Sequence, residues 1–384
     1  MKFRNGLKNA SFGRIRVSES LAGLASIYAI NRGKMNKQTN INSQQDNDEI
    51  EDNIMKKIIS LGFAALFGLS VMASTAAAGN IKWRLQAYEP PSSITTKILA
   101  KMADVVRERT DGELDITIFQ PKVLGYSGWG VHRVVSKKQL EAAEGITAAI
   151  TEIPAYGIFD QPFFTNLDEA EKGWYLIKSD IDKAAQEKMG LKLLKGAGKP
   201  VAGWISKKPI KTVGDLEGLK IRTWNLPLSK WVERMGGVPH SIPYSELYTS
   251  LASGVVEANS SSPVSVIETK LYEVTKYYNK WPSGIVIFVT LVNLEVFNAL
   301  PAKVQNILVE EANKLELEEW KLQAAAGAPA IEKMKEMGMT IIQPSAADLA
   351  KAEAVDKSIR EEWLAVAPPE VQAMAERVRA ALGK

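Results

Sequence analysis

From about residue 81 onward, the spacing of apolar and polar positions alternates between that of a strand and that of a helix. Residues 81–87 alternate apolar and polar side chains as a half-buried strand does, and residues 114–118 do so again. Between them, residues 94–105 repeat apolar side chains at helical spacing, directly after a Pro-Pro-Ser-Ser break that offers a helix cap. The pattern predicts a strand–helix–strand unit at the start of this region.

The same alternation continues through the middle of the chain. The pattern predicts strands at 216–223, 238–242 and 255–259, and helices at 228–235 and 244–253. Strands that alternate with helices are typical of the α/β class. Open α/β sheets place ligands in a crevice at the strand ends, so the ends of these strands are where we expect a site.

Long amphipathic helices are expected in the C-terminal third. Pro301 opens one that runs through Trp320, and a final helix begins at about Pro369. We expect these helices to brace the rest of the fold. Their charged faces, such as Glu310-Glu311, are interpreted as solvated surfaces rather than sites.

A secretory signal peptide is predicted at residues 55–78. Lys56 and Lys57 precede an apolar run at 58–72 and a small-residue stretch, with cleavage expected after Ala78. A membrane anchor is the alternative, but the run is shorter than the roughly 20 residues that span a bilayer. Residues 1–54 are interpreted as a start-site artefact or a disordered extension. The mature protein is therefore expected in the periplasm and not to span the membrane itself.

Charge and composition exclude several functional classes. Residues 1–78 hold ten Lys and Arg against six Asp and Glu, which leaves 38 of each sign in the rest of the 384-residue chain. A neutral mature chain argues against a nucleic-acid partner. The chain has no cysteine and only two histidines, without an HExxH motif, so thiolate chemistry and zinc sites are not expected, and no cofactor is predicted.

Four motifs in order carry a resemblance to a known family. They are Gly218-Leu-Lys-Ile-Arg-Thr-Trp-Asn225, Gly236-Gly-Val-Pro239, Tyr244-Ser-Glu-Leu-Tyr248 and Ser253-Gly-Val-Val-Glu-Ala-Asn259. Their order and spacing resemble the DctP-type solute-binding proteins of TRAP transporters. The similarity covers essentially the whole mature chain and is weakest at residues 126–161.

This resemblance implies a two-lobed periplasmic binding protein-like α/β fold with hinge-crossing strands and long C-terminal helices. Lobe 1 is expected at 79–203, with a return segment at about 288–330. Lobe 2 is expected at 204–287, and hinge-crossing and bracing helices at 288–384. The family's activity implies capture of a small organic acid and delivery to the small and large permease subunits in the membrane, without catalysis. The alternatives are a receptor for an ATP-driven importer or a sensor, and an exported enzyme, although catalytic motifs such as GxSxG are missing.

The resemblance assigns Arg222 to the ligand carboxylate. A guanidinium matches a carboxylate with two parallel hydrogen bonds, and such charge-assisted bonds are strong when sheltered from water. The alternative from the residues alone is that Arg222 pairs with an internal Asp or Glu. A second arginine of many relatives aligns with Ala202, and an asparagine of relatives aligns with Ser260-Ser-Ser262.

The loss of one cation and the presence of tryptophans near the crevice suggest a ligand with one anchored carboxylate and an apolar or aromatic body. Core packing is the alternative for either tryptophan, helix capping is the alternative for Asn225, and a surface turn is the alternative for the glycine-rich loop at 126–130. Opposing-lobe groups are expected to complete the enclosure. The candidate ligand-binding residues are Arg222, Trp204, Trp224, Asn225, Trp129, Tyr156, Asn259 and Ser261.

Overall fold

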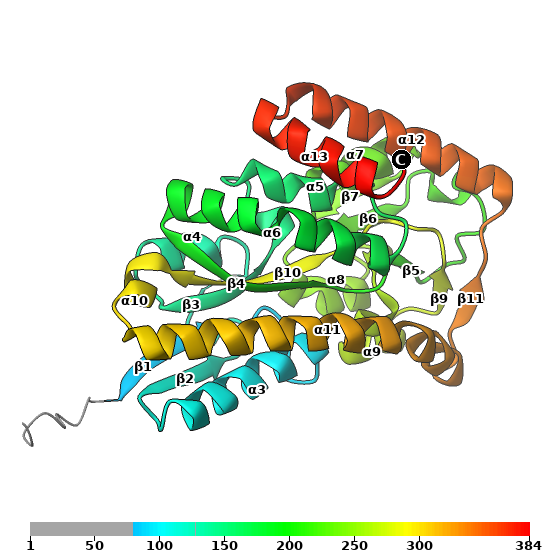
Figure 1. Ribbon diagram of the computed structural model, residues 1–384. Helices are drawn as coiled ribbons and strands as arrows, with labels where there is room; N and C mark the ends of the chain where they lie inside the picture. Colours follow the sequence, from blue (N-terminus) through cyan, green and yellow to red (C-terminus); the bar gives the residue numbers. More distant parts are fainter. Residues whose placement is uncertain (1–79, 127) are drawn as a thin grey trace, which may run out of the picture. The chain divides into compact units, whose positions relative to one another are not determined.

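The computed structural model describes residues 80–126 and 128–384 (Figure 1). The predicted extension at 1–54 and signal peptide at 55–78 lie outside the described residues. Within the described part, every helix is either too short or too polar for a membrane span.

Five strands form the first sheet, in the order β2-β1-β3-β10-β4. They are β1 (Ile81–Gln86), β2 (Leu114–Phe119), β3 (Ala142–Ile146), β4 (Leu191–Gly198) and β10 (Ile287–Asn293). Strand β1 pairs in parallel with β2 and β3, whereas β10 runs antiparallel between β3 and β4. Helices around this sheet are α3 (Ile94–Arg109), α4 (Val131–Ser136), α5 (Gly157–Asp160), α6 (Leu167–Met189) and α10 (Leu294–Asn298).

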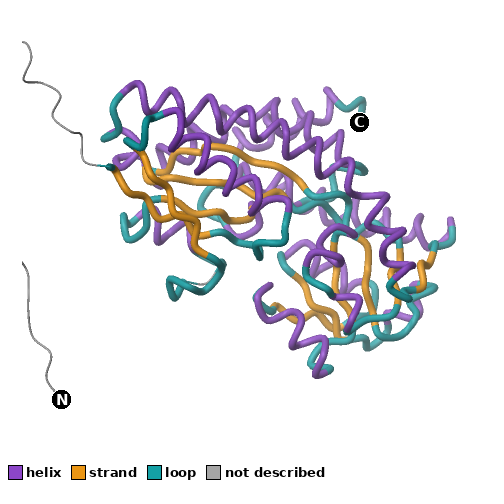
Figure 2. Tube along the Cα trace, turned by 90° about the horizontal axis from the view of Figure 1, so that it is seen from below, coloured by secondary structure: helices purple, strands orange, loops and turns teal. Residues whose placement is uncertain are grey.

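Six strands form the second sheet, in the order β11-β9-β5-β8-β6-β7, and Figure 2 shows its strands as a group separate from the first sheet. They are β5 (Gly203–Ser206), β6 (Lys220–Thr223), β7 (Val238–Ser241), β8 (Ala258–Ser261), β9 (Tyr277–Asn279) and β11 (Thr340–Ile342). Strand β6 is parallel to both β7 and β8. The helices here are α7 (Leu226–Arg234), α8 (Leu247–Ser253) and α9 (Pro263–Glu268).

Two chain segments cross from one sheet to the other and pair with each other on the way. Residues 199–202 join β4 to β5, and residues 280–286 join β9 to β10. The backbone nitrogen of Ala202 donates to the carbonyl oxygen of Gly284 at 2.9 Å, and that of Ser283 donates to the carbonyl oxygen of Ala202 at 2.9 Å. These paired crossings form a two-stranded connection between the sheets, which we call the hinge.

The C-terminal helices connect distant parts of the fold. Helix α11 (Ala302–Glu336) begins after Pro301, as predicted, and continues beyond Trp320 through Pro329. It packs against α3, β4 and α9, so it contacts elements next to both sheets (Figure 1). Helix α12 (Ala346–Val366) packs against α7, and α13 (Pro369–Ala381) packs against α6.

Some element boundaries differ from those predicted. Strand β6 begins at Lys220 rather than at 216, because residues 213–216 form a 3-10 turn that Thr212 and Asp215 close as a capping box. Strand β8 covers 258–261 rather than 255–259, and Val255 is exposed in the turn before it. The predicted helix at 244–253 divides into a 3-10 turn and α8.

Candidate functional site

A small cavity lies beside the hinge and is bounded by residues that both sheets contribute. Its volume is about 40 Å³. This central cavity is lined by Tyr88, Glu89, Ile146, Lys199, Ala202, Arg222, Trp224, Tyr244, Ser260, Ser261, Ser262, Ser265, Val286 and Phe288. Tyr88 and Glu89 follow the end of β1, whereas Arg222 lies on β6, so the cavity is enclosed by strand ends from opposite sheets.

Arg222 is a buried cation in this cavity, with 2 % of the residue exposed. Its Nε donates to the carbonyl oxygen of Ile242 at 2.9 Å, and its Nη1 donates to Oδ1 of Asn259 at 3.4 Å. No acidic side chain in residues 80–126 and 128–384 forms an ion pair with it, and burial lowers the pKa of the guanidinium. The described residues therefore do not provide Arg222 with the internal Asp or Glu partner that was the predicted alternative. The cavity holds a desolvated positive charge whose hydrogen-bond partners are neutral.

Lys199 is the other cation in the lining, and it is surrounded by acids. Its ammonium donates to Glu89 Oε1 at 2.7 Å, to Ser265 Oγ at 3.0 Å and to Glu268 Oε2 at 2.6 Å. Burial acts to lower the pKa of Lys199, but the charges of Glu89 and Glu268 raise it overall. Lys199 is therefore a neutralised cation, in contrast to Arg222.

Aromatic rings form much of the remaining wall. The rings of Tyr88 and Tyr244 stack with centroids 6.2 Å apart, and Phe288 packs edge-on against Tyr88 at 5.7 Å. The guanidinium of Arg222 lies over the ring of Tyr244, 5.8 Å from its centroid. Trp224 donates from Nε1 to Ser260 Oγ at 3.3 Å. An apolar or flat ligand body would meet ring faces on several sides.

The structure brings only some of the predicted site residues into the central cavity. Arg222, Trp224 and Ser261 line it, and Asn259 lies behind Arg222 as its hydrogen-bond partner. Trp204 does not line it; its indole is fully buried and stacks on Trp231 with ring centroids 5.0 Å apart.

The remaining predicted site residues lie outside the central cavity. Tyr156 is buried in the hydrophobic core between the first sheet and its helices. Asn225 caps α7 by accepting from the Leu228 nitrogen at 2.8 Å. Asn225 and Trp129 line a second, wider cavity of about 680 Å³, which shares Trp224 with the central one. Trp224 therefore lines both cavities, whereas Trp129 lines only the wider one.

Sequence reasoning missed several lining residues, chiefly Tyr88, Glu89, Lys199, Tyr244 and Phe288. The Tyr-Glu-Pro-Pro segment directly after the first predicted strand is a signal that could have been used, because strand ends face the crevice in α/β folds. Nothing in the local pattern around Phe288 marks it.

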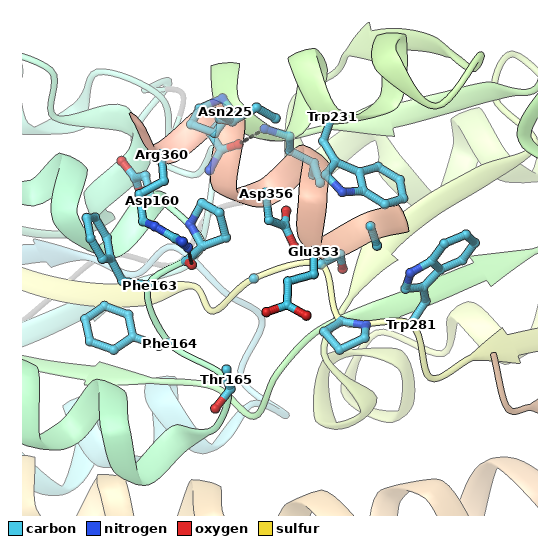
Figure 3. Close-up of a pocket in the computed structure, with 18 of the residues that line it drawn as sticks. Asp160, Phe163, Phe164, Thr165, Asn225, Trp231, Trp281, Glu353, Asp356 and Arg360 are labelled. Carbon is cyan, nitrogen blue, oxygen red and sulfur yellow. Dashed lines mark hydrogen bonds between the residues drawn. The ribbon is translucent and has the colours of Figure 1, made fainter. Parts of the chain in front are cut away.

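A third cavity of about 550 Å³ lies beside α12 (Figure 3). Figure 3 shows Phe163 and Phe164 on one side and Trp231 and Trp281 on the other, with Asp356 of α12 between them. Burial raises the pKa of Asp356 to about 7.

The cations of this third cavity have acidic groups near them. Lys384 donates to Glu169 at 2.6 Å and Arg379 donates to Glu376 at 3.3 Å. Arg360 donates to the carbonyl oxygen of Pro162 at 2.7 Å, and its charge acts on the carboxyl group of Asp356. The central cavity, where Arg222 has no counter-charge, is therefore the better candidate for binding an anion. Among residues 80–126 and 128–384, no cluster of His, Asp or Glu side chains could hold a metal ion.

Comparisons with known proteins show the family to which this chain is similar. Residues 85–365 match the family described as bacterial extracellular solute-binding protein, family 7 (DctP). The 2,3-diketo-L-gulonate-binding periplasmic protein YiaO of Escherichia coli strain K12 is 29 % identical over 262 residues, which cover 66 % of this chain and 79 % of that protein.

Two solved structures extend the likeness to the fold. DctP6, a Bordetella pertussis extracytoplasmic solute receptor binding pyroglutamic acid, is 28 % identical with a TM-score of 0.74, and the match covers 78 % of this chain and 100 % of that one. A TRAP periplasmic solute-binding protein from Desulfovibrio salexigens with bound orotic acid is 25 % identical with a TM-score of 0.71, covering 78 % and 97 %. These likenesses confirm the predicted two-lobed α/β fold.

Proposed function

The chain belongs to the DctP family of bacterial extracellular solute-binding proteins, and from this premise we propose that it captures a small monocarboxylate on Arg222 and delivers it to TRAP permease subunits. Its place in the family makes it an extracytoplasmic TRAP receptor for small organic acids, not an enzyme. The alternatives of an ATP-driven importer receptor and an exported enzyme are set aside by this assignment.

The observation that carries the proposal is the unpaired charge of Arg222. A buried guanidinium without a counter-charge is costly, because both its solvation by water and an ion-pair partner are lacking. A ligand carboxylate in the central cavity would supply that partner with two parallel, charge-assisted hydrogen bonds. The Nη atoms of Arg222 have capacity for them, since Nε bonds to Ile242 and only the long Asn259 contact uses Nη1.

A single carboxylate fits the cavity better than two. Ala202, which the resemblance aligns with a second arginine of many relatives, lines the cavity. Lys199 is already held by Glu89 and Glu268. The rings of Tyr88, Tyr244 and Phe288 offer apolar contact for the rest of the ligand. The ligands in the names of the three relatives above, 2,3-diketo-L-gulonate, pyroglutamic acid and orotic acid, each have one carboxylate, which supports the same choice. Pyroglutamate, the smallest of the three, is the first candidate. It is larger than the cavity of about 40 Å³, so its binding would require the cavity to widen.

Closure about the hinge would complete capture. Arg222 belongs to the second sheet, whereas Phe288 belongs to the first and Tyr88 follows its strand β1, so a ligand between them contacts both lobes. Such a ligand stabilises the closed form to the extent that it binds that form better than the open one. The closed protein would then be the form that the membrane subunits recognise.

The test measures binding to protein exported into the periplasm of a bacterial host and purified from it. Organic acids are screened by thermal shift, with pyroglutamate first, and hits are titrated by calorimetry into wild type and Arg222→Ala. We expect a one-to-one complex with a monocarboxylate, and a loss of about a hundredfold or more in affinity in Arg222→Ala. Stabilisation only by uncharged sugars, or equal affinity in the variant, would refute the assignment. Mass spectrometry of the same protein checks export, since cleavage after Ala78 leaves Gly79 as the first residue.

A further inference from the structure

Lys199 uses its whole hydrogen-bonding capacity inside the protein. An ammonium group has three protons, and the acceptors in Glu89, Ser265 and Glu268 account for all three. Lys199, Glu89 and Glu268 together are called the Lys199 cluster below. With both acids ionised, the cluster has one negative charge in excess, so it repels an anion even though a lysine lines the cavity.

The two acids of the cluster occupy different positions. Glu89 lines the central cavity together with Arg222 and Tyr244, and its Oε2 lies 2.7 Å from the lysine nitrogen without receiving a hydrogen bond. Glu268 is not part of the lining; its Oε1 accepts from the backbone nitrogen of Ile94 at 2.7 Å. A ligand group that passes the aromatic wall would therefore meet the charge of Glu89 directly.

We propose that Lys199 is a masked second anion site and that Glu89 is the residue that restricts this receptor to monocarboxylates. The inference rests on the proposed function, because it takes one ligand carboxylate to be bound at Arg222. A second carboxylate on the same ligand would lie beside Glu89, and like charges in a desolvated cavity reject a partner strongly. With Glu89 neutral, Lys199 retains only Glu268 as a counter-charge and can turn toward a ligand anion.

Protonation of Glu89 removes its negative charge from the cavity without a mutation. Burial raises the pKa of Glu89 to about 7, with Lys199 acting to lower it and the charges of Glu268 and Glu319 acting to raise it. Tyr88, Tyr244 and Glu144 are the other titratable groups whose charges act on it or respond to it. When the pH falls through this range, Glu89 takes up a proton, its negative charge disappears, and a second ligand carboxylate is tolerated better.

Butyrate and succinate form a matched pair of probes, because succinate has a carboxylate where butyrate has a methyl group. Calorimetry gives the ratio of their association constants in wild type, Glu89→Gln, Glu268→Gln and the double variant Glu89→Gln/Lys199→Met. We expect the ratio to shift toward succinate by about tenfold or more in Glu89→Gln. Glu268→Gln also removes one negative charge next to Lys199, but Glu268 does not line the cavity. We therefore expect it to shift the ratio toward succinate clearly less. The double variant should lose the gain, because the second cation is absent.

Each alternative result contradicts the inference. An unchanged ratio in a folded Glu89→Gln protein, an equal shift in Glu268→Gln, or a gain that persists without Lys199 would overturn it. If Glu89→Gln does not fold, the wild-type protein alone tests the inference. Its ratio of succinate to butyrate affinity must rise as the pH falls from about 8 to about 6.5, a range in which both probes stay ionised. A ratio that does not change with pH overturns the inference. Butyrate binding that does not depend on Arg222 would instead refute the proposed function, so the two failures are distinguishable.

Discussion

Trp174 on α6 donates from its indole nitrogen to Oε1 of Glu316 on α11 at 2.9 Å, deep between these helices and the first sheet. The same carboxylate accepts from the Gly196 nitrogen of β4 at 2.6 Å and from Lys178 at 2.6 Å. Glu316 thus joins two helices and one strand of the sheet through three partners, and its side chain is almost fully buried. Its role is structural, and it lies outside the central cavity.

Replacement of Glu316 should therefore destabilise the protein without changing ligand affinity. We expect Glu316→Ala to lower the free energy of unfolding by about 3 to 5 kcal/mol, because it leaves Lys178 and two N–H donors without their acceptor. Denaturant unfolding followed by circular dichroism measures this. The exposed Glu318→Ala on the same helix is the control, since its pair with Lys101 is a surface ion pair worth at most about 1 kcal/mol. Equal losses in both variants would contradict the role given to Glu316.

Arg222 should lower the stability of the ligand-free protein. Its guanidinium is desolvated and lacks an acidic partner among the described residues, so an apolar side chain of similar length removes a buried charge. We expect Arg222→Met to raise the free energy of unfolding of the ligand-free protein by about 1 to 3 kcal/mol, despite the loss of the bond to Ile242. The same variant should not be stabilised by any carboxylate that stabilises wild type. Thermal unfolding with and without ligand measures both effects, and a less stable ligand-free variant would argue that the arginine has a structural role.

The two tryptophans that the sequence placed near the crevice should behave differently when replaced by phenylalanine. Trp224 lines the central cavity, so we expect Trp224→Phe to weaken ligand binding several-fold through the loss of ring contact and of the bond to Ser260. Trp204 stacks on Trp231 in the core, so Trp204→Phe should leave affinity unchanged and lower stability by about 1 to 3 kcal/mol. Titration calorimetry and thermal unfolding of both variants separate the cases. The reverse assignment of effects would place Trp204 at the ligand.

Local signals explain which parts of the fold could be predicted. The unit β1–α3–β2 followed the sequence closely, because Ser93 accepts from the Thr96 nitrogen as an N-cap and Gly112 adopts a positive φ at the turn. Strands β4 and β10 are buried on both faces, so they show no alternation and could not be separated from buried helix by pattern. The turn at 213–216 replaced part of a predicted strand because its capping box satisfies the backbone locally.

The candidate site likewise has one part that the sequence identified and one part that it did not. Arg222 and Trp224 belong to one continuous motif, so the sequence identified them together. Lys199, Glu89 and Glu268 meet only in the folded protein, at sequence separations of 110 and 69 residues from the lysine. No local pattern carries such a contact. Trp204 was placed at the site because it is near Ala202 in sequence. Ala202 lies in the hinge, whereas Trp204 is on β5 and its indole packs on Trp231 in the core, so proximity along the chain does not bring both side chains to the cavity.

The buried carboxyl of Glu144 predicts how stability depends on pH. Glu144 on β3 is 1 % exposed and accepts from the backbone nitrogen of Tyr88 at 3.1 Å. Burial raises its pKa to about 8; Lys195 acts to lower it, while Glu319 and Glu89 act to raise it further. The unfolded chain has a glutamate pKa of about 4.3. Between these two values the folded protein binds more protons than the unfolded one, so stability falls as the pH rises.

Glu144→Gln should therefore flatten this fall, because glutamine stays neutral. We expect the melting temperature of wild type to decrease from about pH 5 to about pH 8, and the variant to lose less over the same interval, so that it gains on wild type as the pH rises. Glu141→Gln is the matched control: burial acts to raise the pKa of Glu141, but hydrogen bonds from Arg84 lower it overall. Its contribution is present above the unfolded value and is lost in acid, so Glu141→Gln should leave the slope between pH 5 and pH 8 unchanged. Because Glu89 titrates in the same direction, some slope must remain in Glu144→Gln, and a slope equal to that of wild type would mean that Glu144 is ionised in the folded protein at neutral pH.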